Sequence, residues 1–265
     1  MYAKFQLAAK YLRYYINASN GKGHGIHSPF VFDFVIHVLN DKRTFYAYNK
    51  IEDCRFTLLS DTTALETTDF GAGSVSGNTG KKTIASIAKH AAKPKKWGQL
   101  LFRIVNYYQP RTILELGTSL GLSAAYMAMG NSKAKLITCE GAPAIAAMAK
   151  QNFASLGLQQ IEIVTGNFDD RLDGVLNQLA TIDLAFIDGN HRKEPTLRYF
   201  EQLLRKKNDQ TVMIFDDIHW SKDMELAWNE IKEHPQVMLT IDLFFIGLVF
   251  FRKEFKMKQH FVLRF

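Results

Sequence analysis

Cysteine is scarce in this chain. Only Cys54 and Cys139 occur among its 265 residues, and they lie far apart without the spacing of metal ligands. This pattern argues against a disulfide framework and a cysteine-ligated metal site, so we expect reduced thiols in a cytoplasmic protein.

Long apolar runs are missing as well. No stretch approaches the roughly 18 consecutive apolar residues of a membrane span. Lys4, Lys10 and Arg13 interrupt the apolar residues of the N-terminal stretch, whereas a secretion signal has an uninterrupted apolar centre. We therefore expect neither a membrane span nor a secreted protein.

The excess of positive charge is confined to the first hundred residues. Residues 1–100 contain 14 Lys and Arg against 7 Asp and Glu, while residues 101–265 contain 19 of each, which together give the formal net charge of +7. A basic segment can attract nucleic acid, phosphates or a membrane surface. An excess of this size is also typical of an ordinary solvated face, which is the interpretation that we favour.

Residues 1–108 are predicted to form a mainly helical extension or lid. Ser28 and Pro29 have the pattern of a helix N-cap followed by proline at the first helical position, with the helix running to about Leu39. The stretch 68–82 is rich in glycine, serine and threonine and is predicted to be a lid or a plain surface loop. The other helices expected in this part cover residues 2–18, part of 41–68, 82–91 and 97–108.

From residue 109 to 265 the pattern becomes regular and predicts one α/β domain. Apolar runs that suit strands alternate with segments of helix length, which is typical of βαβ units in a doubly wound parallel sheet. Two final runs, 237–242 and 245–252, are too close for a helix between them and should pair antiparallel at the sheet edge. The expected strands are 112–116, 135–140, 161–165, 182–188 and 211–216, and the expected helices are 121–130, 143–156, 169–180, 194–206 and 221–233.

A glycine-bearing turn follows the first of these strands. Gly117 and Gly121 lack a Cβ atom, so the backbone there can approach a ligand closely at the start of a helix. The spacing G-x-x-x-G-x-S, with Ser119 at the central position and Ser123 at its end, differs from the G-x-G-x-x-G of dinucleotide enzymes. Thr118 completes the predicted ligand-binding turn.

Polar residues that follow the next two strands suggest a nucleoside. Glu140 ends the second strand, followed by Gly141, and a carboxylate there can accept both hydroxyls of a ribose. After the third strand, Asn167, Phe168 and Asp169 are candidates to frame a base, although Asp169 could instead cap the next helix.

Three carboxylates follow the fourth and fifth strands. Asp188 ends one strand, and Asp216 with Asp217 ends the other, so a parallel sheet should bring them together. Clustered carboxylates repel one another unless a cation shares the site, and hard oxygen ligands suit Mg²⁺, Mn²⁺ or Ca²⁺. The alternative is that Asp216 or Asp217 caps the next helix while Asp188 orients the cofactor or substrate.

These stretches together resemble the class I S-adenosylmethionine-dependent O-methyltransferases, and the catechol O-methyltransferase-like group in particular. The resemblance covers about residues 109–220 and is carried by ILELGTSLGLS, KLITCE, GNFD, DLAFIDGNH and MIFDDIHW. It implies a Rossmann-like methyltransferase fold and S-adenosyl-L-methionine as cofactor. By motif, Glu115, Gly117 and Ser123 would hold the methionine part and Glu140 the ribose. The implied Mg²⁺ site consists of Asp188, Asp216 and Asp217.

The chain departs from the catechol enzymes at two positions. Asp217 stands where they have asparagine, and His191 stands where they have the lysine that acts as general base. Histidine can accept a proton near neutral pH. The expected reaction is therefore methyl transfer to an oxygen of a small-molecule acceptor, with His191 as proton acceptor and His219 as its substitute.

Other functions remain open at this stage. A nucleic-acid methyltransferase would use the basic N-terminal part, but the N/D-P-P-Y/F-like motif of amino-group methylation is missing after Asp188. A cofactor-binding module without catalysis and a nucleotide-dependent oxidoreductase are the further alternatives. A second copy of the chain, in a homodimer, is an open expectation.

Overall fold

The computed structural model describes residues 1–19, 21–23, 26–67 and 80–265. The contacts of the chain divide it into two compact units, one formed by residues 1–40 with 179–265 and the other by residues 41–178. The sequence-based boundary near residue 108 stays a prediction. Most of the predicted loop 68–82 lies outside the described residues, but its last three residues belong to a strand, Gly80–Thr83.

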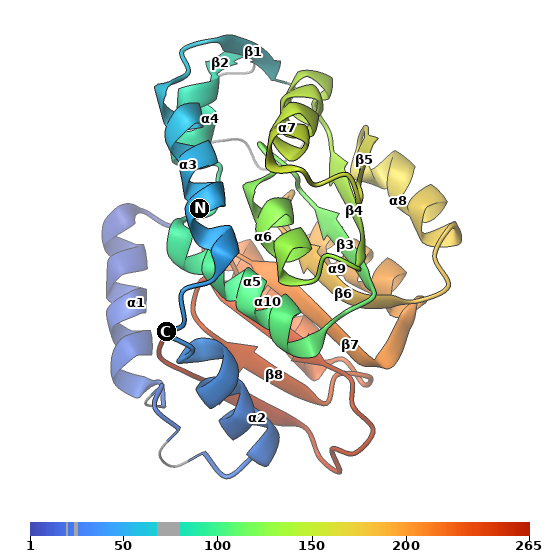
Figure 1. Cartoon of the computed structure of the whole chain (residues 1–265). Helices are drawn as coiled ribbons and strands as arrows, with labels where there is room; N and C mark the ends of the chain where they lie inside the picture. Colours follow the sequence, from blue (N-terminus) through green and yellow to red (C-terminus); the bar gives the residue numbers. More distant parts are fainter. Residues whose placement is uncertain (20, 24–25, 68–79) are drawn as a thin grey trace. The chain divides into compact units, whose positions relative to one another are not determined.

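Besides the two-stranded sheet described below, the unit of residues 41–178 contains three parallel strands and six helices among its described residues (Figure 1). Strand β4 pairs in parallel with both β3 and β5. Helix α6 contacts β4, while α7 contacts both β4 and β5. The strands are β3 (Thr112–Leu116), β4 (Lys135–Glu140) and β5 (Ile161–Thr165), and the helices are α3 (Tyr46–Ser60), α4 (Ile84–His90), α5 (Lys95–Tyr108), α6 (Leu122–Gly130), α7 (Pro143–Leu156) and α8 (Phe168–Asn177).

Local sequence explains where several of these helices begin and end. Helix α7 has Pro143 at its first position and is followed by Gly157, which adopts a left-handed conformation with φ of 75°. Helix α5 is followed by Gln109 in the left-handed region and then by Pro110, which cannot continue a helix. Because helix α5 ends there, strand β3 follows it closely, and the glycine turn comes directly after β3.

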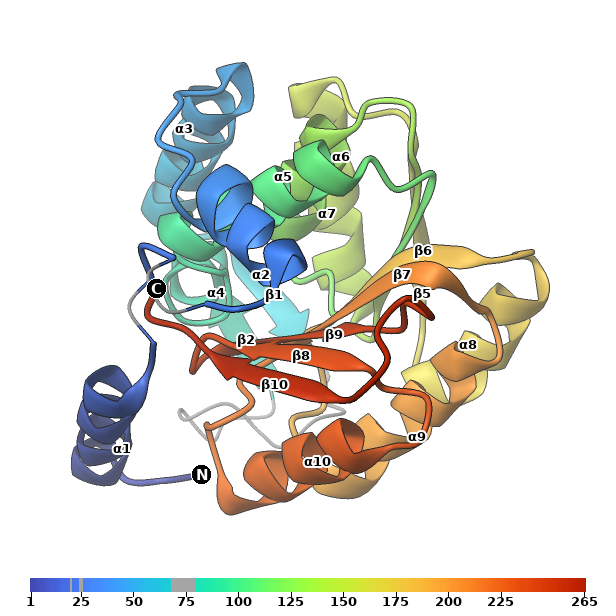
Figure 2. The same ribbon diagram turned by 90° about the horizontal axis from the view of Figure 1, so that it is seen from below.

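The unit of residues 1–40 and 179–265 contains five strands in the order β10-β8-β9-β7-β6 (Figure 2). Strand β6 pairs in parallel with β7, β9 pairs antiparallel with β7 and β8, and β10 pairs in parallel with β8. The strands are β6 (Ile182–Ile187), β7 (Lys207–Asp216), β8 (Leu239–Asp242), β9 (Ile246–Phe250) and β10 (Gln259–Val262), and the helices are α1 (Lys4–Asn17), α2 (Pro29–Phe34), α9 (Lys193–Leu204) and α10 (Lys222–Glu233).

Helices cover both faces of this five-stranded region. On one face the indole of Trp228, from α10, lies against Gly247 of β9, where a Cβ atom would be 2.6 Å from the ring. On the opposite face the Phe250 ring of β9 meets Phe30 and Phe34 of α2, with ring centroids 4.9 and 6.4 Å apart. The predicted α/β class, with parallel strands and a C-terminal antiparallel hairpin, is confirmed.

Ser28 is confirmed as the N-cap of α2, since its hydroxyl accepts a hydrogen bond from the Val31 amide. The helix then continues as a π-helical turn over Val35–Leu39. One detail of the predicted sheet is wrong. The hairpin of β8 and β9 does not form the edge, because β10 pairs outside β8. Strand β10 is four residues long and only half-buried, so no apolar run marks it in the sequence.

A second small sheet was not predicted. Strands β1 (Ala64–Thr67) and β2 (Gly80–Thr83) form an antiparallel pair. The sequence Gly-Lys-Lys-Thr of β2 contains little that favours a strand, since glycine and lysine are depleted in strands. Pairing with β1 overrides this local preference.

Candidate active site

The turn after β3 is held by the neighbouring strand and by unusual backbone angles. The amides of Gly117 and Thr118 both donate to the Cys139 carbonyl of β4, at 3.0 and 3.1 Å. Gly117, Ser119 and Gly121 have φ of 110°, 48° and 84°. A serine in this region is uncommon and marks a strained position. The turn is therefore a fixed structure held by β4.

Gly121 is required by the packing of the chain itself. A Cβ atom at this position would lie 2.5 Å from the Phe153 ring of α7. The structure therefore gives this glycine a packing reason, which is close contact between the start of α6 and α7. Its role in letting a ligand approach the backbone stays a prediction.

A chain of side-chain hydrogen bonds joins the turn to strands β3 and β4. The Thr138 hydroxyl donates to Glu115 Oε2 at 2.5 Å and lies 2.5 Å from the Thr118 hydroxyl, which can donate to it in turn. Glu115 is completely buried, and burial raises its pKa to about 7, although the hydroxyls of Ser123 and Thr138 oppose the rise. Its Oε1 atom and the Ser119 hydroxyl are buried without a hydrogen-bond partner among the described residues. Sequence reasoning missed Thr138, because no motif marks a threonine inside a strand.

Glu140 joins the end of β4 to the turn. Its Oε2 accepts from the Ser119 amide at 2.8 Å, and its Oε1 accepts from the Ala142 amide at 3.0 Å. Burial raises the pKa of Glu140, while the amides of Ala142, Ser119 and Gly141 oppose the rise. A carboxylate has about four lone-pair positions, so Glu140 keeps acceptor capacity beyond these backbone amides. The structure thus brings Glu140 and Ser119 together.

The residues after β5 open helix α8. Asn167 is the N-cap, and its side chain accepts from the Asp169 amide at 3.2 Å. The suggested capping role of Asp169 is therefore filled by Asn167, and Asp169 lies in the first turn of the helix. Phe168 is the first helical residue and is half-buried. Their role in framing a base stays a prediction.

In the other unit, Asp188, His191 and Asp216 form a cluster. Each offers one ligand atom, and these atoms lie within 4.8 Å of one another. His191 Nε2 lies 3.7 Å from Asp188 Oδ1. Asp216 is 2% exposed and ends β7. The predicted set contained Asp217 in place of His191, and Asp217 is not part of this cluster.

The backbone explains this difference. Asn190, His191 and Asp217 have φ of 70°, 42° and 54°. The left-handed conformation redirects each side chain in a way that strand alternation does not predict. Neither Asp216 nor Asp217 caps α10, because Ser221 accepts the capping bond from Met224.

Asn190 fixes the loop after β6. Its Nδ2 donates to the Tyr199 hydroxyl at 3.1 Å, and its Oδ1 accepts from Arg192 Nε at 2.7 Å. These contacts tie the loop that carries Asp188 and His191 to helix α9. Sequence reasoning did not assign Asn190 a role, although it stands within the DGNH motif.

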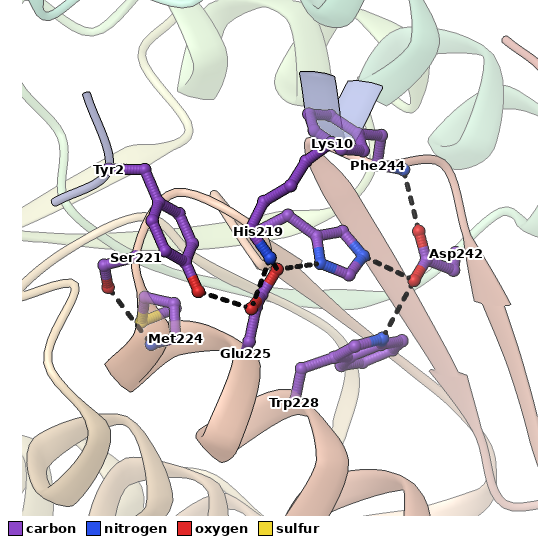
Figure 3. A network of polar contacts seen from close by, with 9 residues as sticks. All are labelled: Tyr2, Lys10, His219, Ser221, Met224, Glu225, Trp228, Asp242 and Phe244. Carbon is purple, nitrogen blue, oxygen red and sulfur yellow. Dashed lines mark hydrogen bonds and ion pairs between the residues drawn. The ribbon is translucent and has the colours of Figure 1, made fainter. Parts of the chain in front are cut away.

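His219 lies in a separate polar network (Figure 3). Its Nε2 is 2.8 Å from Asp242 Oδ2, and its Nδ1 is 3.2 Å from Glu225 Oε1. Glu225 also accepts from the Tyr2 hydroxyl and from Lys10 Nζ, at 2.7 and 2.9 Å. Both imidazole nitrogens of His219 therefore face carboxylates of the protein, so neither is left to accept a proton from an acceptor hydroxyl.

The network predicts a pH-dependent contribution to stability. Burial lowers the pKa of His219, but Asp242 and Glu225 outweigh it, so the pKa is raised. His219 should contribute its full stabilisation at pH values below its pKa in the unfolded chain, which is about 6.5. This contribution should be lost as the pH rises through the pKa of His219 in the folded protein. We expect His219→Gln to cost about 2 kcal/mol below that pH and less above it, measured by urea unfolding across pH.

His260 offers a control of opposite sign. Burial lowers its pKa, and its imidazole contacts the Thr240 hydroxyl. The wild-type protein should therefore lose stability at this site as pH falls through about 6.5, and His260→Gln should relieve that loss. Parallel pH profiles for the two variants would contradict the assignment to His219.

Comparison with known sequences identifies the family. A profile described as "Methyltransferase domain" matches residues 114–218. A catechol O-methyltransferase of Niastella koreensis is 36% identical over 124 residues, covering 46% of this chain and 55% of the relative. The catechol O-methyltransferase of Sus scrofa is 33% identical over 140 residues, covering 49% of this chain and 72% of the relative. The chain belongs to the catechol O-methyltransferase family.

Solved structures show the same fold. An O-methyltransferase from Bacillus cereus, in complex with SAH, has a TM-score of 0.57 at 21% identity, covering 81% of this chain and 95% of its own. An SAH-bound Podospora anserina methyltransferase has a TM-score of 0.58 at 14% identity, covering 96% and 98%. At these identities the likeness concerns the fold alone.

The family match falls on the two groups of residues described above. The stretch 114–218 contains the turn, Glu140 and the cluster of Asp188, His191 and Asp216. This member of the catechol O-methyltransferase family spans 55% and 54% of the relatives from Niastella koreensis and Mycobacterium tuberculosis. None of the helices in the described part of the chain is long and apolar enough to cross a membrane.

Proposed function

We propose that this protein transfers a methyl group from S-adenosyl-L-methionine to an oxygen atom of a small-molecule acceptor. The observation that carries the proposal is the contact between Glu140 Oε2 and the Ser119 amide. It joins the turn proposed to bind the methionine part to the carboxylate proposed to bind the ribose. Membership of the catechol O-methyltransferase family supports the same reaction.

The turn fits a ligand that carries hydrogen-bond donors. Glu115 Oε1 and the Ser119 hydroxyl are buried there without partners among the described residues, and buried polar atoms in proteins nearly always have one. An ammonium group, such as that of the methionine part, would supply donors. Glu140 keeps acceptor capacity for ribose hydroxyls, and Asn167, Phe168 and Asp169 are proposed to surround the base. The bound cofactor supplies an electrophilic methyl group on a sulfonium centre.

We further propose that Asp188 and Asp216 hold a divalent cation. Two carboxylates with ligand atoms within 4.8 Å of each other suit Mg²⁺ or Mn²⁺. If the nearby His191 nitrogen also binds the ion, Mn²⁺ would be preferred over Mg²⁺. Such an ion lowers the pKa of an acceptor hydroxyl when it is bound. Asp217 is left out of this proposed set.

His191 is proposed to accept the proton of the acceptor hydroxyl. Its side chain is 26% exposed, so a small molecule can reach it, and Nε2 lies 3.7 Å from Asp188 Oδ1. That carboxylate would stabilise the imidazolium that forms. His191 would take the proton that the acceptor hydroxyl loses when its oxygen receives the methyl group.

Calorimetric titration tests the cofactor assignment. We expect S-adenosylhomocysteine to bind and NAD to bind at least tenfold more weakly. Glu140→Gln should weaken S-adenosylhomocysteine binding at least tenfold, because an amide cannot accept from two hydroxyls as a carboxylate does. Glu162→Gln, at an exposed glutamate on the neighbouring strand β5, is the control. Preference for NAD, or equal affinity of the two variants, would contradict the proposal.

The salt dependence of methyl transfer tests whether the acceptor is a small molecule or a nucleic acid. A nucleic-acid acceptor would engage the basic N-terminal part through phosphates, and its methylation would fall steeply with salt concentration. We expect a flat salt profile with a small phenolic acceptor and no turnover of RNA. Salt-sensitive turnover of RNA would replace the small-molecule acceptor in the proposal.

A further inference from the structure

Helix α1 has two apolar faces. The first packs against the turn between β8 and β9, where the ring centroid of Phe244 lies 5.1 Å from that of Tyr11 and 5.2 Å from that of Tyr14. The residues of this face follow one another at intervals of four, three and four positions: Leu7, Tyr11, Tyr14 and Ala18. This spacing belongs to one side of a helix, so α1 already has the apolar contact that holds it on the protein.

The second apolar face points away from this contact. It has the same spacing and begins two residues earlier, with the exposed side chains of Phe5, Ala9, Leu12 and Ile16, which we call the outer stripe. Two residues correspond to about 200° around a helix, so the two faces lie on opposite sides of α1. In the outer stripe, Phe5, Leu12 and Ile16 are 74%, 60% and 64% exposed.

Polar contacts hold α1 in this orientation. The Tyr2 hydroxyl and Lys10 Nζ both donate to Glu225 of helix α10, at 2.7 and 2.9 Å (Figure 3). The Tyr14 hydroxyl donates to the Leu263 carbonyl. A rotation of α1 that buried the outer stripe would break these bonds and the ring contacts on the first face. A contiguous apolar face that a fixed helix exposes is typical of an interaction surface.

The charges beside the outer stripe are positive. The first 32 residues contain no Asp or Glu, whereas α1 contains three basic residues. One of them, Lys10, is bound in the contact just described, but Lys4 and Arg13 are exposed. Lys4 precedes Phe5 and Arg13 follows Leu12, each about 100° further around the helix, so the two cations lie on opposite sides of the stripe. An apolar stripe between two cations is complementary to the acyl boundary and the anionic headgroups of a membrane.

A second copy of the chain fits the outer stripe less well. Two α1 helices packed through it would bring Lys4 and Arg13 of one copy near the same cations of the other, and neither helix has an acid to pair with them. A stable protein interface also takes about 20 to 30 residues from each side, whereas the stripe supplies four. Charge and size therefore both favour a membrane surface.

We propose that α1 binds this protein to a membrane surface that carries anionic phospholipids. The helix lies in the plane of the surface, with the outer stripe at the acyl boundary and with Lys4 and Arg13 among the headgroups. Its 14 residues are fewer than the roughly 20 of a spanning helix, so it lies on the membrane and does not cross it. This binding is independent of the proposed methyl transfer.

Co-sedimentation of the full chain with lipid vesicles tests the proposal. We expect binding to vesicles of equal parts phosphatidylcholine and phosphatidylglycerol, and binding about tenfold weaker to phosphatidylcholine alone. The double variant Phe5→Gln/Ile16→Gln should bind the mixed vesicles about tenfold more weakly, because it loses apolar side chains that would enter the acyl boundary. Lys4→Gln/Arg13→Gln should lose about tenfold on the mixed vesicles and nothing on phosphatidylcholine.

Matched controls come from exposed residues of the same unit outside α1. Met257→Gln removes an apolar side chain that is 69% exposed, and Lys256→Gln removes an exposed cation. Both should bind vesicles as the wild-type protein does. Every replaced side chain is exposed, so thermal unfolding should be unchanged in all four variants.

Sedimentation velocity without vesicles separates a membrane from a second copy. We expect wild type and Phe5→Gln/Ile16→Gln to have the same assembly state. A dimer that this variant loses would assign the outer stripe to a second copy and overturn the proposal. Absence of binding to the mixed vesicles, or losses in the controls equal to those in the α1 variants, would overturn it as well.

Discussion

Replacing His191 with asparagine is expected to lower kcat for methyl transfer by a factor of about 100 to 10,000, the usual contribution of a positioned general base. The imidazole Nε2 lies 3.7 Å from Asp188 Oδ1, at the point where β6 and β7 place their terminal carboxylates. Asparagine tolerates the left-handed φ of 42° at this position, so the backbone should keep its path. His90→Asn, at an exposed histidine that ends helix α4, is the control and should be fully active.

The same variant separates a proton acceptor from a metal ligand, because His191 cannot hold a cation and accept a proton at one nitrogen. If it accepts the proton, His191→Asn should bind Mn²⁺ about as well as wild type, measured by the loss of the free-ion signal in electron paramagnetic resonance. Asp216→Asn should weaken Mn²⁺ binding at least tenfold. A tenfold loss of Mn²⁺ affinity in His191→Asn would make it a ligand and remove it as the base.

The sequence predicted the parts of the fold that depend on short, contiguous patterns. Strand β3 has the predicted bounds Thr112–Leu116, because four apolar or β-branched residues around Glu115 are followed directly by a glycine turn. Helix α7 also has its predicted bounds, set by Pro143 at its start and Gly157 after its end. Strand β10 has no such marks, and its pairing with β8 depends on residues about twenty positions away.

The candidate site was predictable in its residue types and less so in its geometry. Asp216 and Asp217 are indistinguishable in the sequence, yet only Asp216 joins the cluster, since Asp217 has a left-handed backbone. His219 looked like a catalytic histidine beside two acids. Its partners, Glu225 and Asp242, lie 6 and 23 residues further along the chain and commit it to a structural network. Contacts of that kind become visible only when the elements are packed.

Replacing Glu115 with glutamine is expected to stabilise the ligand-free protein above pH 7. The free energy of unfolding of the variant minus that of wild type should be about 3 kcal/mol larger there than at acid pH. Burial raises the pKa of Glu115 from 4.5 to about 7. The folded state therefore binds this proton more tightly than the unfolded state, and wild-type stability falls as pH rises from about 4.5 to about 7. Glutamine has the same shape, can still accept from the Thr138 hydroxyl, and does not titrate.

Urea unfolding of both proteins at a series of pH values measures the difference. The gain should be small below pH 4.5, grow to about pH 7 and then level off. Glu162→Gln, at the exposed glutamate of β5, should show no such rise. A gain that is constant across pH would mean that Glu115 does not titrate between the two states.

The Glu115→Gln variant should bind the cofactor less well than wild type, which would explain why a carboxylate is buried at this position. Glu115 Oε1 is buried without a partner among the described residues, in the turn proposed to receive an ammonium group. Above pH 7 the ionised carboxylate destabilises the empty turn, and a bound cation would offset that cost. Glu115→Gln should therefore lose at least tenfold in affinity for S-adenosylhomocysteine at pH 8 while unfolding at higher urea. A variant that gained stability and kept its affinity would show that the charge of Glu115 does not serve the cofactor.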